Sequence, residues 1–267
     1  MSAPRASRRR PIAWHTTAVK ISIADLEHVA APGWRAPHEA RLGEWLLRAA
    51  GGFTGRANSA LAAGDPGMPV ADAVGAVGRW YAARGLRAMI AVPYPAGQPR
   101  RSELDLFLAG VGWTVRADAA TVMTATTAGV ARFARAAAVS IDPAPDAAWL
   151  GQYHYRGQQL PPLAIRLLTS APWQAFASIR EGGETLAIGR VAASGDWAGL
   201  TAIEVDPRHR RRGLGAAVTT ALAAYAADHG FRGLYLQVSD GNAAARSLYG
   251  QLGFADHHGY HYRVAPA

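Results

Sequence analysis

Residues 203–216 read IEVDPRHRRRGLGA, and this stretch says more about the fold than any other part of the chain. The apolar run ending at Val205 predicts a strand, the arginines after it a loop, and Gly213 and Gly215 the start of an alanine-rich helix. A helix N-terminus offers unpaired N–H groups and a partial positive charge, and glycine lets the backbone approach an anion closely. The stretch therefore predicts a diphosphate site between a strand and a helix.

Two better-known phosphate loops fit this stretch poorly. A Walker loop requires Gly-Lys-Ser/Thr, and no lysine is present here. A Rossmann turn requires glycine directly after the strand and a third glycine where this chain has Val218. Neither loop accounts for the arginine insertion.

The length of 267 residues allows one large domain or two of moderate size, and two is the better expectation. Half of the residues are apolar and 18% are charged, which is typical of a globular protein. No apolar run reaches the ~18 residues that a membrane span requires, and the N-terminus has no secretory signal pattern. We expect a cytoplasmic protein that does not contact a membrane.

The net charge of +9 is concentrated in two places. Residues 1–20 carry five basic residues and no acid, and the loop at 208–212 carries four arginines. This distribution predicts a disordered basic tail over residues 1–20 and does not favour a nucleic-acid partner. The chain has no cysteine, which excludes disulfides, thiolate zinc sites and an acyl-cysteine intermediate.

Helix and strand patterns alternate along the first half. Apolar residues at helical spacing predict a helix over 40–49 that ends at Gly51-Gly52, followed by a strand over 53–61. The remaining expectations are a helix over 70–84, a buried strand over 86–92, a helix over 103–109 and strands within 113–123. Residues 128–145 are rich in alanine and proline, which predicts a linker between a domain at 21–127 and a domain at 146–267.

The second half follows a similar order. A helical region over 146–170, interrupted by Pro161-Pro162, precedes strands over 174–180, 185–193 and 200–205. A helix from the glycines to His229, a strand over 234–238, a helix over 243–252 and a terminal strand pair through Tyr262 complete the prediction. WYAARGLR at 80–87 is similar to YAADHGFR at 225–232, and VGW at 111–113 to LGF at 252–254, which indicates a duplicated domain.

Arg210-x-x-Gly213-x-Gly215 resembles the Arg/Gln-x-x-Gly-x-Gly/Ala motif of the GNAT acetyltransferases. The segments NAAARSLY at 242–249 and LGF at 252–254 are similar to the second GNAT signature. With these motifs the resemblance covers about residues 146–264, and it includes the first half only through the repeat. The resemblance implies an α/β fold (α+β, with a mixed sheet) of tandem GNAT-like domains, the N-terminal one degenerate.

The same resemblance implies acetyl-CoA as co-substrate, held where the sheet splays after Val205. The residues implied in cofactor binding are Val205, Arg210, Arg211, Arg212, Gly213, Leu214, Gly215, Ala216, Asn242 and Tyr249. Acyl transfer to an amine requires a neutral amine, a polarised thioester and a proton for the thiolate. Tyr249 matches the acid of the family. Glu204 matches its carboxylate base, although it could equally pair with the arginine loop.

The closing segment HHGYHYR at 257–263 carries three of the nine histidines. On a strand, His257, His261 and Arg263 share one face, and His258, Tyr260 and Tyr262 share the other. No carboxylate or cysteine stands nearby in the sequence, so we expect no metal. Surface side chains are the plainer interpretation, and lining an acceptor site is the alternative.

The two-domain layout resembles the actinobacterial N-acetylglutamate synthase-like proteins, which implies the α-amine of glutamate as acceptor. A mycothiol synthase-like enzyme, a protein or histone-like lysine acetyltransferase and a non-catalytic CoA-binding sensor stay open. A substrate with two carboxylates requires fixed cationic donors. The sequence offers Arg156, Arg166, Arg190 and Arg263 for this role without ranking them. The sequence does not indicate an oligomeric state.

Overall fold

The computed structural model describes residues 20–117, 119–134, 138–154 and 160–267. The predicted basic tail, apart from Lys20, lies outside these residues, and so does Arg156. No helix among the described residues combines the length and the apolar character that crossing a membrane requires.

Helices and strands alternate through the described chain. The first half contains α1 (Ile23–Ala30), η1 (Ala31–Trp34), β1 (His38–Leu42), β2 (Trp45–Ala49), η2 (Arg56–Asn58), β3 (Ala60–Leu61), α2 (Val70–Ala82), β4 (Met89–Pro95), α3 (Glu103–Gly110), β5 (Thr114–Val115) and β6 (Ala120–Thr126). The second half contains α4 (Thr127–Ala131), β7 (Ser140–Asp142), α5 (Ala147–Gln152), α6 (Pro162–Leu168), β8 (Trp173–Glu181), β9 (Glu184–Ser194), β10 (Trp197–Val205), η3 (Pro207–His209), α7 (Leu214–Asp228), β11 (Gly233–Ser239), α8 (Ala243–Gln251) and β12 (Ala255–Val264).

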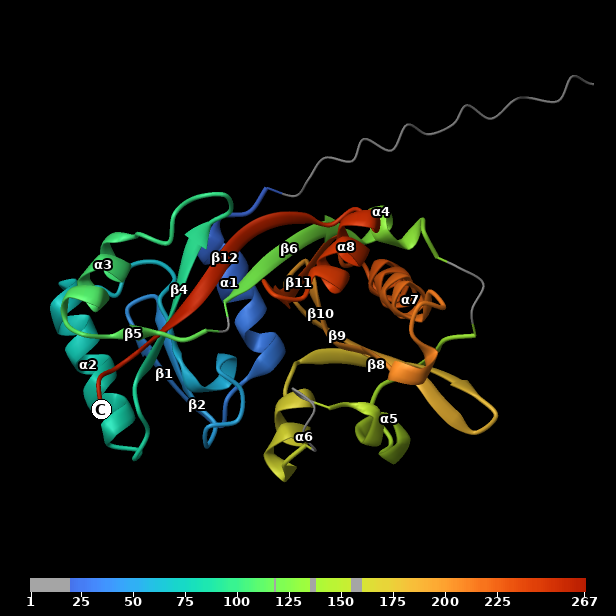
Figure 1. Ribbon diagram of the computed structural model, residues 1–267, viewed down its shortest axis with the longest axis horizontal. Helices are drawn as coiled ribbons and strands as arrows, with labels where there is room; N and C mark the ends of the chain where they lie inside the picture. Colours follow the sequence, from blue (N-terminus) through green and yellow to red (C-terminus); the bar gives the residue numbers. More distant parts are fainter. Residues whose placement is uncertain (1–19, 118, 135–137, 155–159) are drawn as a thin grey trace, which may run out of the picture.

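A single mixed sheet connects the two halves. Its strand order is β1-β2-β3-β4-β12-β6-β11-β10-β9-β8-β7, and β5 pairs with β12. The β3–β4 and β10–β11 pairs are parallel, and the other pairs are antiparallel. The last strand, β12, pairs with β4 of the first half, while β6 of the first half pairs with β11 of the second. Each half thus places one strand beside the other half, as β6 and β12 show in Figure 1.

The two halves repeat one helix–strand–helix unit, α2–β4–α3 in the first and α7–β11–α8 in the second. Glycines with positive φ end all four helices, at Gly85, Gly112, Gly230 and Gly253. In each case the next residue donates its N–H to the carbonyl of the last helical turn, as Leu86 does to Tyr81 and Phe231 to Ala226. This glycine-closed helix end satisfies carbonyls that the helix leaves unpaired, and its recurrence agrees with the predicted repeat.

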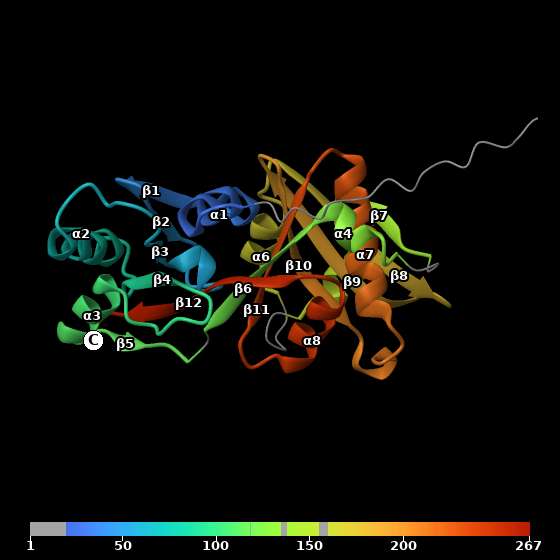
Figure 2. The same ribbon diagram turned by 90° about the horizontal axis from the view of Figure 1, so that it is seen from above.

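Helices cover both faces of the sheet (Figure 2). On one face α2 and α3 pack on the first half, and α4, α7 and α8 pack on the second. On the other face α1 covers the centre, and α5 and α6 cover β8 and β9. The alternation of a strand explains this arrangement, because Trp45 and Leu47 face α2 while Leu46 faces α1.

The structure confirms the predicted α2, α3, α7 and α8 within two residues at each end, and likewise β8, β9 and β11. The strand predicted over 86–92 lies three residues later, as β4, and the strand predicted over 200–205 begins three residues earlier, as β10. The predicted helix over 40–49 is wrong, because these residues form the β1–β2 hairpin around Gly43. Every residue of β2 is buried, since helices cover both of its faces. A strand with buried apolar residues on both faces also matches the helical spacing, which explains the error.

Two further segments differ from the prediction. Within 53–61 only Ala60–Leu61 forms a strand, because the Asn58 side chain closes a loop. It accepts hydrogen bonds from the N–H groups of Ala50 and Gly52 and donates to the carbonyls of Phe53 and Thr54. The terminal strand pair is instead the single strand β12, whose register shifts between Asp256 and His258.

Candidate active site

The strand β10 separates from β11 halfway along its length. The two pair in parallel register from Trp197 to Leu200. Beyond this point the register of β10 with β9 shifts between Thr201 and Glu204, and Ala202 adopts a φ of 53°. A bulge bends the strand that carries it, so the end of β10 diverges from β11.

A cavity of about 730 Å³ occupies this divergence, and we name it the splay cavity. Its walls come from β10, β11, α8, the loop after β10 and the residues that follow α5. The lining residues are Gln152, Tyr153, His154, Leu200, Thr201, Ala202, Ile203, Glu204, Asp206, Pro207, Arg210, Leu236, Gln237, Val238, Ser239, Asn242, Ala245 and Tyr249. The structure therefore brings Glu204, Arg210, Asn242 and Tyr249 to one cavity. Val205 and residues 211–216 stand outside its lining.

Tyr249 and Glu204 enter the splay cavity from different elements. Tyr249 lies on α8 and is 8% exposed, and burial raises the pKa of its hydroxyl to about 12. Glu204 lies on β10, where one carboxylate oxygen accepts a hydrogen bond from the backbone N–H of His154 at 2.9 Å. The other oxygen lies 3.5 Å from Nδ1 of His154. Because its pKa is raised, the Tyr249 hydroxyl keeps its proton at neutral pH, as a general acid in catalysis requires.

Carboxylates hold part of the arginine loop in place. Arg208 pairs with Asp206 at 2.9 Å and with Glu184. Hydrogen bonds from the Arg208 side chain and backbone lower the pKa of Asp206 to about 2. Arg212 pairs with Glu181 at 3.2 Å. The loop is therefore fixed at both ends by ion pairs.

Arg210 and Arg211 are arranged differently. The Nε of Arg210 donates to the Val205 carbonyl at 3.4 Å, which keeps its exposed side chain at the cavity. Arg211 is exposed and has a φ of 64°. The loop thus presents positive charge beside the end of β10.

The N-terminus of α7 follows the loop and has the features of an anion site. Gly213 precedes the helix with a φ of 78°, and among the described residues no side chain caps this N-terminus. A Cβ on Gly215 would lie 3.3 Å from Leu248 and 3.6 Å from Val205, so the backbone approaches both β10 and α8 closely. On α8, the Asn242 side chain accepts the N–H of Ala245. Uncapped N–H groups, nearby arginines and an adjoining cavity fit a diphosphate with an acyl-carrying arm.

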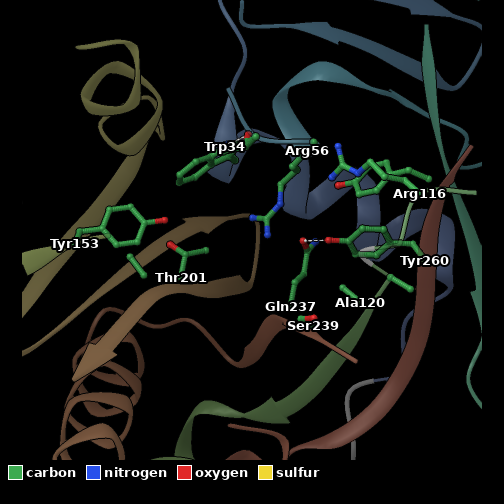
Figure 3. A pocket seen from close by; sticks show the side chains of 14 residues that line it. Trp34, Arg56, Arg116, Ala120, Tyr153, Thr201, Gln237, Ser239 and Tyr260 are labelled. Carbon is green, nitrogen blue, oxygen red and sulfur yellow. Dashed lines mark hydrogen bonds between the residues drawn. The ribbon is translucent and has the colours of Figure 1, made fainter. Parts of the chain in front are cut away.

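A second cavity of about 450 Å³ adjoins the first, and we name it the inter-half cavity. It shares Tyr153, Thr201, Ala202, Gln237 and Ser239 with the splay cavity. The rest of its lining comes mainly from the first half and from β12: Trp34, Thr54, Gly55, Arg56, Arg116, Ala119, Ala120, Tyr260 and Tyr262. Figure 3 shows the guanidinium of Arg56 pointing into it, between Thr201 and Gln237. Both halves therefore build the space beside the divergence of β10.

The arginines that the sequence offered for carboxylates lie elsewhere. Arg263 binds Asp105 through two nitrogens, each at 2.8 Å, and Arg166 is exposed on α6. Arg190 is buried behind the cavity wall, where its NH1 lies 3.3 Å from the Thr201 hydroxyl. The arginines that line the inter-half cavity are Arg56, on the short η2 turn, and Arg116, in the loop after β5, and no local motif distinguishes either one.

The histidine-rich segment is interior and not a surface strand, because β12 lies between β4 and β6. From His258 onward its faces separate as predicted: Tyr260 and Tyr262 line the inter-half cavity, while His261 contacts Asp105 of α3 at 2.6 Å. The predicted face is wrong for His257, which precedes the register shift and contacts the Ile21 carbonyl at 3.0 Å, beside His258. His258 contacts Glu27 of α1 at 2.8 Å. In the part of the chain that the structure describes, no group of three or more His, Asp or Glu side chains is placed to hold a metal.

Comparison with known proteins shows to which family the chain belongs. The sequence profile of the family described as "Probable histone acetyltransferase Rv0428c C-terminal" matches residues 21–263. The chain is 28% identical to the uncharacterized N-acetyltransferase YobR of Bacillus subtilis over 253 residues, which are 91% of this chain and 98% of YobR. It is 30% identical to the probable histone acetyltransferase Rv0428c of Mycobacterium tuberculosis over 250 residues, 92% of this chain and 74% of that protein.

Solved structures show the same fold. A GCN5-related N-acetyltransferase from Kribbella flavida superposes with a TM-score of 0.66 at 17% identity, over 91% of this chain and 95% of that one. A tandem GNAT protein from the clavulanic acid biosynthesis pathway superposes with a TM-score of 0.62 at 18% identity, over 88% and 86%. The chain therefore belongs to the family of the Rv0428c C-terminal region and is an N-acetyltransferase of the GNAT type.

Proposed function

We propose that this enzyme moves an acetyl group from acetyl-CoA directly to the primary amine of a small acceptor, with both substrates bound together. The observation that carries the proposal is that the splay cavity adjoins the inter-half cavity, with Thr201 and Ala202 lining both. One cavity adjoins the uncapped helix α7, and the other lies on the side of the first half. Two substrates can enter from opposite sides and meet at the bulge of β10.

In this proposal the N–H groups from Arg210 to Ala216 and the side chains of Arg210, Arg211 and Arg212 hold the diphosphate. Val205 and Asn242 flank the arm that carries the acetyl thioester. Bound acetyl-CoA supplies the acetyl group. The remaining chemistry is proton transfer by the protein.

Glu204 and Tyr249 perform these proton transfers in the proposal. Glu204 helps remove the proton of the acceptor ammonium, and Tyr249 donates its hydroxyl proton to the departing thiolate. The raised pKa of Tyr249 supports the second role, since the hydroxyl stays protonated wherever the amine is reactive. The chain has no cysteine to carry the acetyl group, which favours direct transfer.

The proposed acceptor is the α-amine of glutamate or of a similar small acidic amine, in line with the N-acetylglutamate synthase-like layout. The inter-half cavity supports a small acceptor, because its described lining encloses about 450 Å³ and comes from both halves. The proposal includes a cytoplasmic location. The lack of cysteine supports this location, since proteins of oxidising compartments commonly carry disulfides.

The test is release of free CoA thiol at saturating acetyl-CoA, measured with glutamate, glutamine, a cysteinyl amine and a basic lysine peptide. We expect glutamate to give the highest kcat/KM. A cysteinyl amine as the best acceptor would instead support a mycothiol synthase-like enzyme. Cofactor binding without thiol release from any amine would support a CoA-binding sensor.

Protein lysine acetylation is the second candidate, and the name of the mycobacterial relative favours it. A lysine chain would enter the inter-half cavity as a cation, beside Arg56 and Arg116. Like charges disfavour that approach. A preference for the lysine peptide over glutamate in the same assay would overturn the small-acid proposal.

A further inference from the structure

The inter-half cavity is lined by cations and by no acid. Among its described lining residues Arg56 and Arg116 are charged, and none is Asp or Glu. Arg56 lies on the η2 turn, which the Asn58 side chain closes, so its backbone is fixed. In Figure 3 its guanidinium reaches the middle of the cavity.

One acid, Glu27, lies beside the inter-half cavity without lining it. Glu27 borders a small adjoining space together with Arg48 and Arg56. One carboxylate oxygen of Glu27 lies 2.8 Å from Nε2 of His258. Glu27 also favours the charge of Arg56, whose guanidinium donates a hydrogen bond to the Tyr260 hydroxyl.

A second cation stands behind the cavity wall. Arg190 has 0% exposure, and its guanidinium contacts the Gly33 carbonyl, the Gln174 side chain and the Thr201 hydroxyl. These partners are neutral, and within the described residues its Nε has no hydrogen-bond partner. Burial lowers the pKa of Arg190 to about 10, which shows that its charge is disfavoured there.

Arg56 and Arg190 approach the same aromatic ring. Each guanidinium carbon lies 5.7 Å from the ring centroid of Trp34, a residue that lines the inter-half cavity. Of the two, Arg190 is buried without a counter-charge among its hydrogen-bond partners, which is costly, and an anion placed nearby lowers that cost. The side of the inter-half cavity next to Trp34 therefore favours the binding of an anionic group.

Neutral donors complete the site. The Tyr260 hydroxyl donates to Oε1 of Gln237 at 3.0 Å, so the other end of this amide is an N–H donor. The Thr201 hydroxyl borders the same cavity. Arginine, amide and hydroxyl donors on a fixed frame are the groups that bind a carboxylate.

We propose that Arg56 is the specificity-determining residue of the acceptor site and binds a carboxylate of the acceptor, with Arg190 supporting the same charge from behind the wall. The acceptor class is then an amine that also carries a carboxylate. This inference rests on the proposed function, because it places the acceptor in the inter-half cavity. It also assigns acceptor selection to the first half, which lacks the diphosphate loop.

The first experiment uses the unaltered enzyme. Glutarate carries the two carboxylates of glutamate without its amine, and glutaramide is its neutral counterpart. We expect glutarate to compete with glutamate and to raise the melting temperature in the presence of CoA, while glutaramide does neither. Equal effects of glutarate and glutaramide, or no effect of either, would overturn the carboxylate site.

The second experiment compares Arg56→Gln, Arg56→Lys and the control Arg101→Gln, which removes an exposed arginine outside both cavities. A lost charge-assisted hydrogen bond predicts a fall of kcat/KM for glutamate by about 10- to 100-fold in Arg56→Gln, mainly through KM. Arg56→Lys should recover part of this loss, because the charge is retained. Acetyl-CoA affinity by calorimetry should stay unchanged in all three variants.

The outcomes separate the two proposals. In one outcome the unaltered enzyme prefers glutamate to glutamate α-amide and to glutamine, while the kcat/KM of Arg56→Gln for glutamate stays within two-fold of the unaltered value. That result would overturn the role of Arg56 and leave the proposed function standing. If Arg56→Gln does not fold, Arg56→Lys and the glutarate comparison decide the same question. An unaltered enzyme that acetylates peptide lysines and no amino acid overturns the proposed function as well.

Discussion

Gly215 is the residue whose size matters most for the proposed diphosphate site. A Cβ added at Gly215 would point toward Leu248 and Val205, into the narrow space between α8 and β10. Gly215→Glu would put a long side chain and a negative charge at the start of α7, where a helix N-terminus favours an anionic ligand. We expect the calorimetric affinity for acetyl-CoA to fall by at least about 100-fold, equivalent to ~2.7 kcal/mol, with the fold retained.

The matched control is Gly250→Glu on α8, where an added Cβ would meet no atom within 4 Å. This variant should bind acetyl-CoA like the unaltered enzyme. If Gly215→Glu and Gly250→Glu bind acetyl-CoA with equal affinity, the diphosphate does not bind at the N-terminus of α7.

Tyr249 and Glu204 carry the proton transfers of the proposed mechanism. A general acid or base contributes about 10²- to 10⁴-fold, so Tyr249→Phe and Glu204→Gln should each lower kcat by about that factor with little loss of acetyl-CoA affinity. Tyr225→Phe, on α7 against Trp173, and Glu103→Gln, exposed on α3, are the controls. Full turnover of Glu204→Gln across the pH range would make Glu204 structural.

The pH dependence of turnover also tests Tyr249. Burial raises the pKa of this hydroxyl to about 12, so the acid keeps its proton as the pH rises from 7 to 10. Over the same range the acceptor amine loses its proton and becomes reactive. Turnover should therefore rise and reach a plateau by pH 10. A decline below pH 10 that is absent from Tyr249→Phe would show that Tyr249 titrates earlier than its burial implies.

At the scale of the element, the bulge in β10 decides where the sheet opens. Ala202 has a φ of 53°, a conformation that a residue other than glycine adopts at a cost of about 1–2 kcal/mol. Ala202→Gly removes this cost but gains freedom in the unfolded chain, so its stability should change by less than about 1 kcal/mol. Valine is branched at Cβ and tolerates this conformation least.

Ala202→Val should therefore lower the free energy of unfolding by about 1–3 kcal/mol and weaken acetyl-CoA binding, because the strand can relieve strain by closing toward β11. Denaturant unfolding and calorimetry measure both effects against Ala202→Gly. If Ala202→Val loses neither stability nor acetyl-CoA affinity, the separation of β10 from β11 does not depend on the backbone conformation of Ala202.

At the scale of the whole molecule, we propose that residues 21–127 and 146–267 are two units that exchange one strand each. The exchange places β6 between β11 and β12, and β12 between β4 and β6. A chain that starts at Asp142 would lack β4, β5 and β6, leaving one edge of β11 and both edges of β12 unpaired. Unpaired strand edges favour aggregation over folding.

The segment 142–267 should therefore be insoluble or show no cooperative unfolding, whereas a chain that starts at Lys20 keeps every described element and should fold and bind acetyl-CoA. Circular dichroism with thermal denaturation, followed by calorimetry, distinguishes these outcomes. A soluble segment 142–267 with full acetyl-CoA affinity would show that the exchanged strands are dispensable for the cofactor site.

Sequence alone predicted the parts of this protein whose residues are adjacent in the chain. The strand end, arginine loop and glycine-led helix of residues 203–216 are contiguous, so local spacing was enough to predict them. The resemblance to the GNAT motifs singled out Glu204, Arg210 and Tyr249, and the structure places all three at the splay cavity. The amphipathic helix α2 was equally accessible, because its apolar spacing reflects one covered face. The helix α7 was accessible from the glycines at its start and its alanine-rich sequence. The hairpin at 38–49 was not, since burial on both faces of β2 removes the alternation that marks a strand.

Only the tertiary structure decided what surrounds the acceptor side of the site. Arg56, Gln237 and Tyr260 are far apart in the chain and meet because β6 and β12 cross between the halves. No pattern within a short window encodes such a meeting, since strand exchange depends on which edges pair after collapse. The same reason explains why Arg190 and Arg263 seemed equivalent in the sequence. Packing placed one behind the cavity wall and bound the other to Asp105.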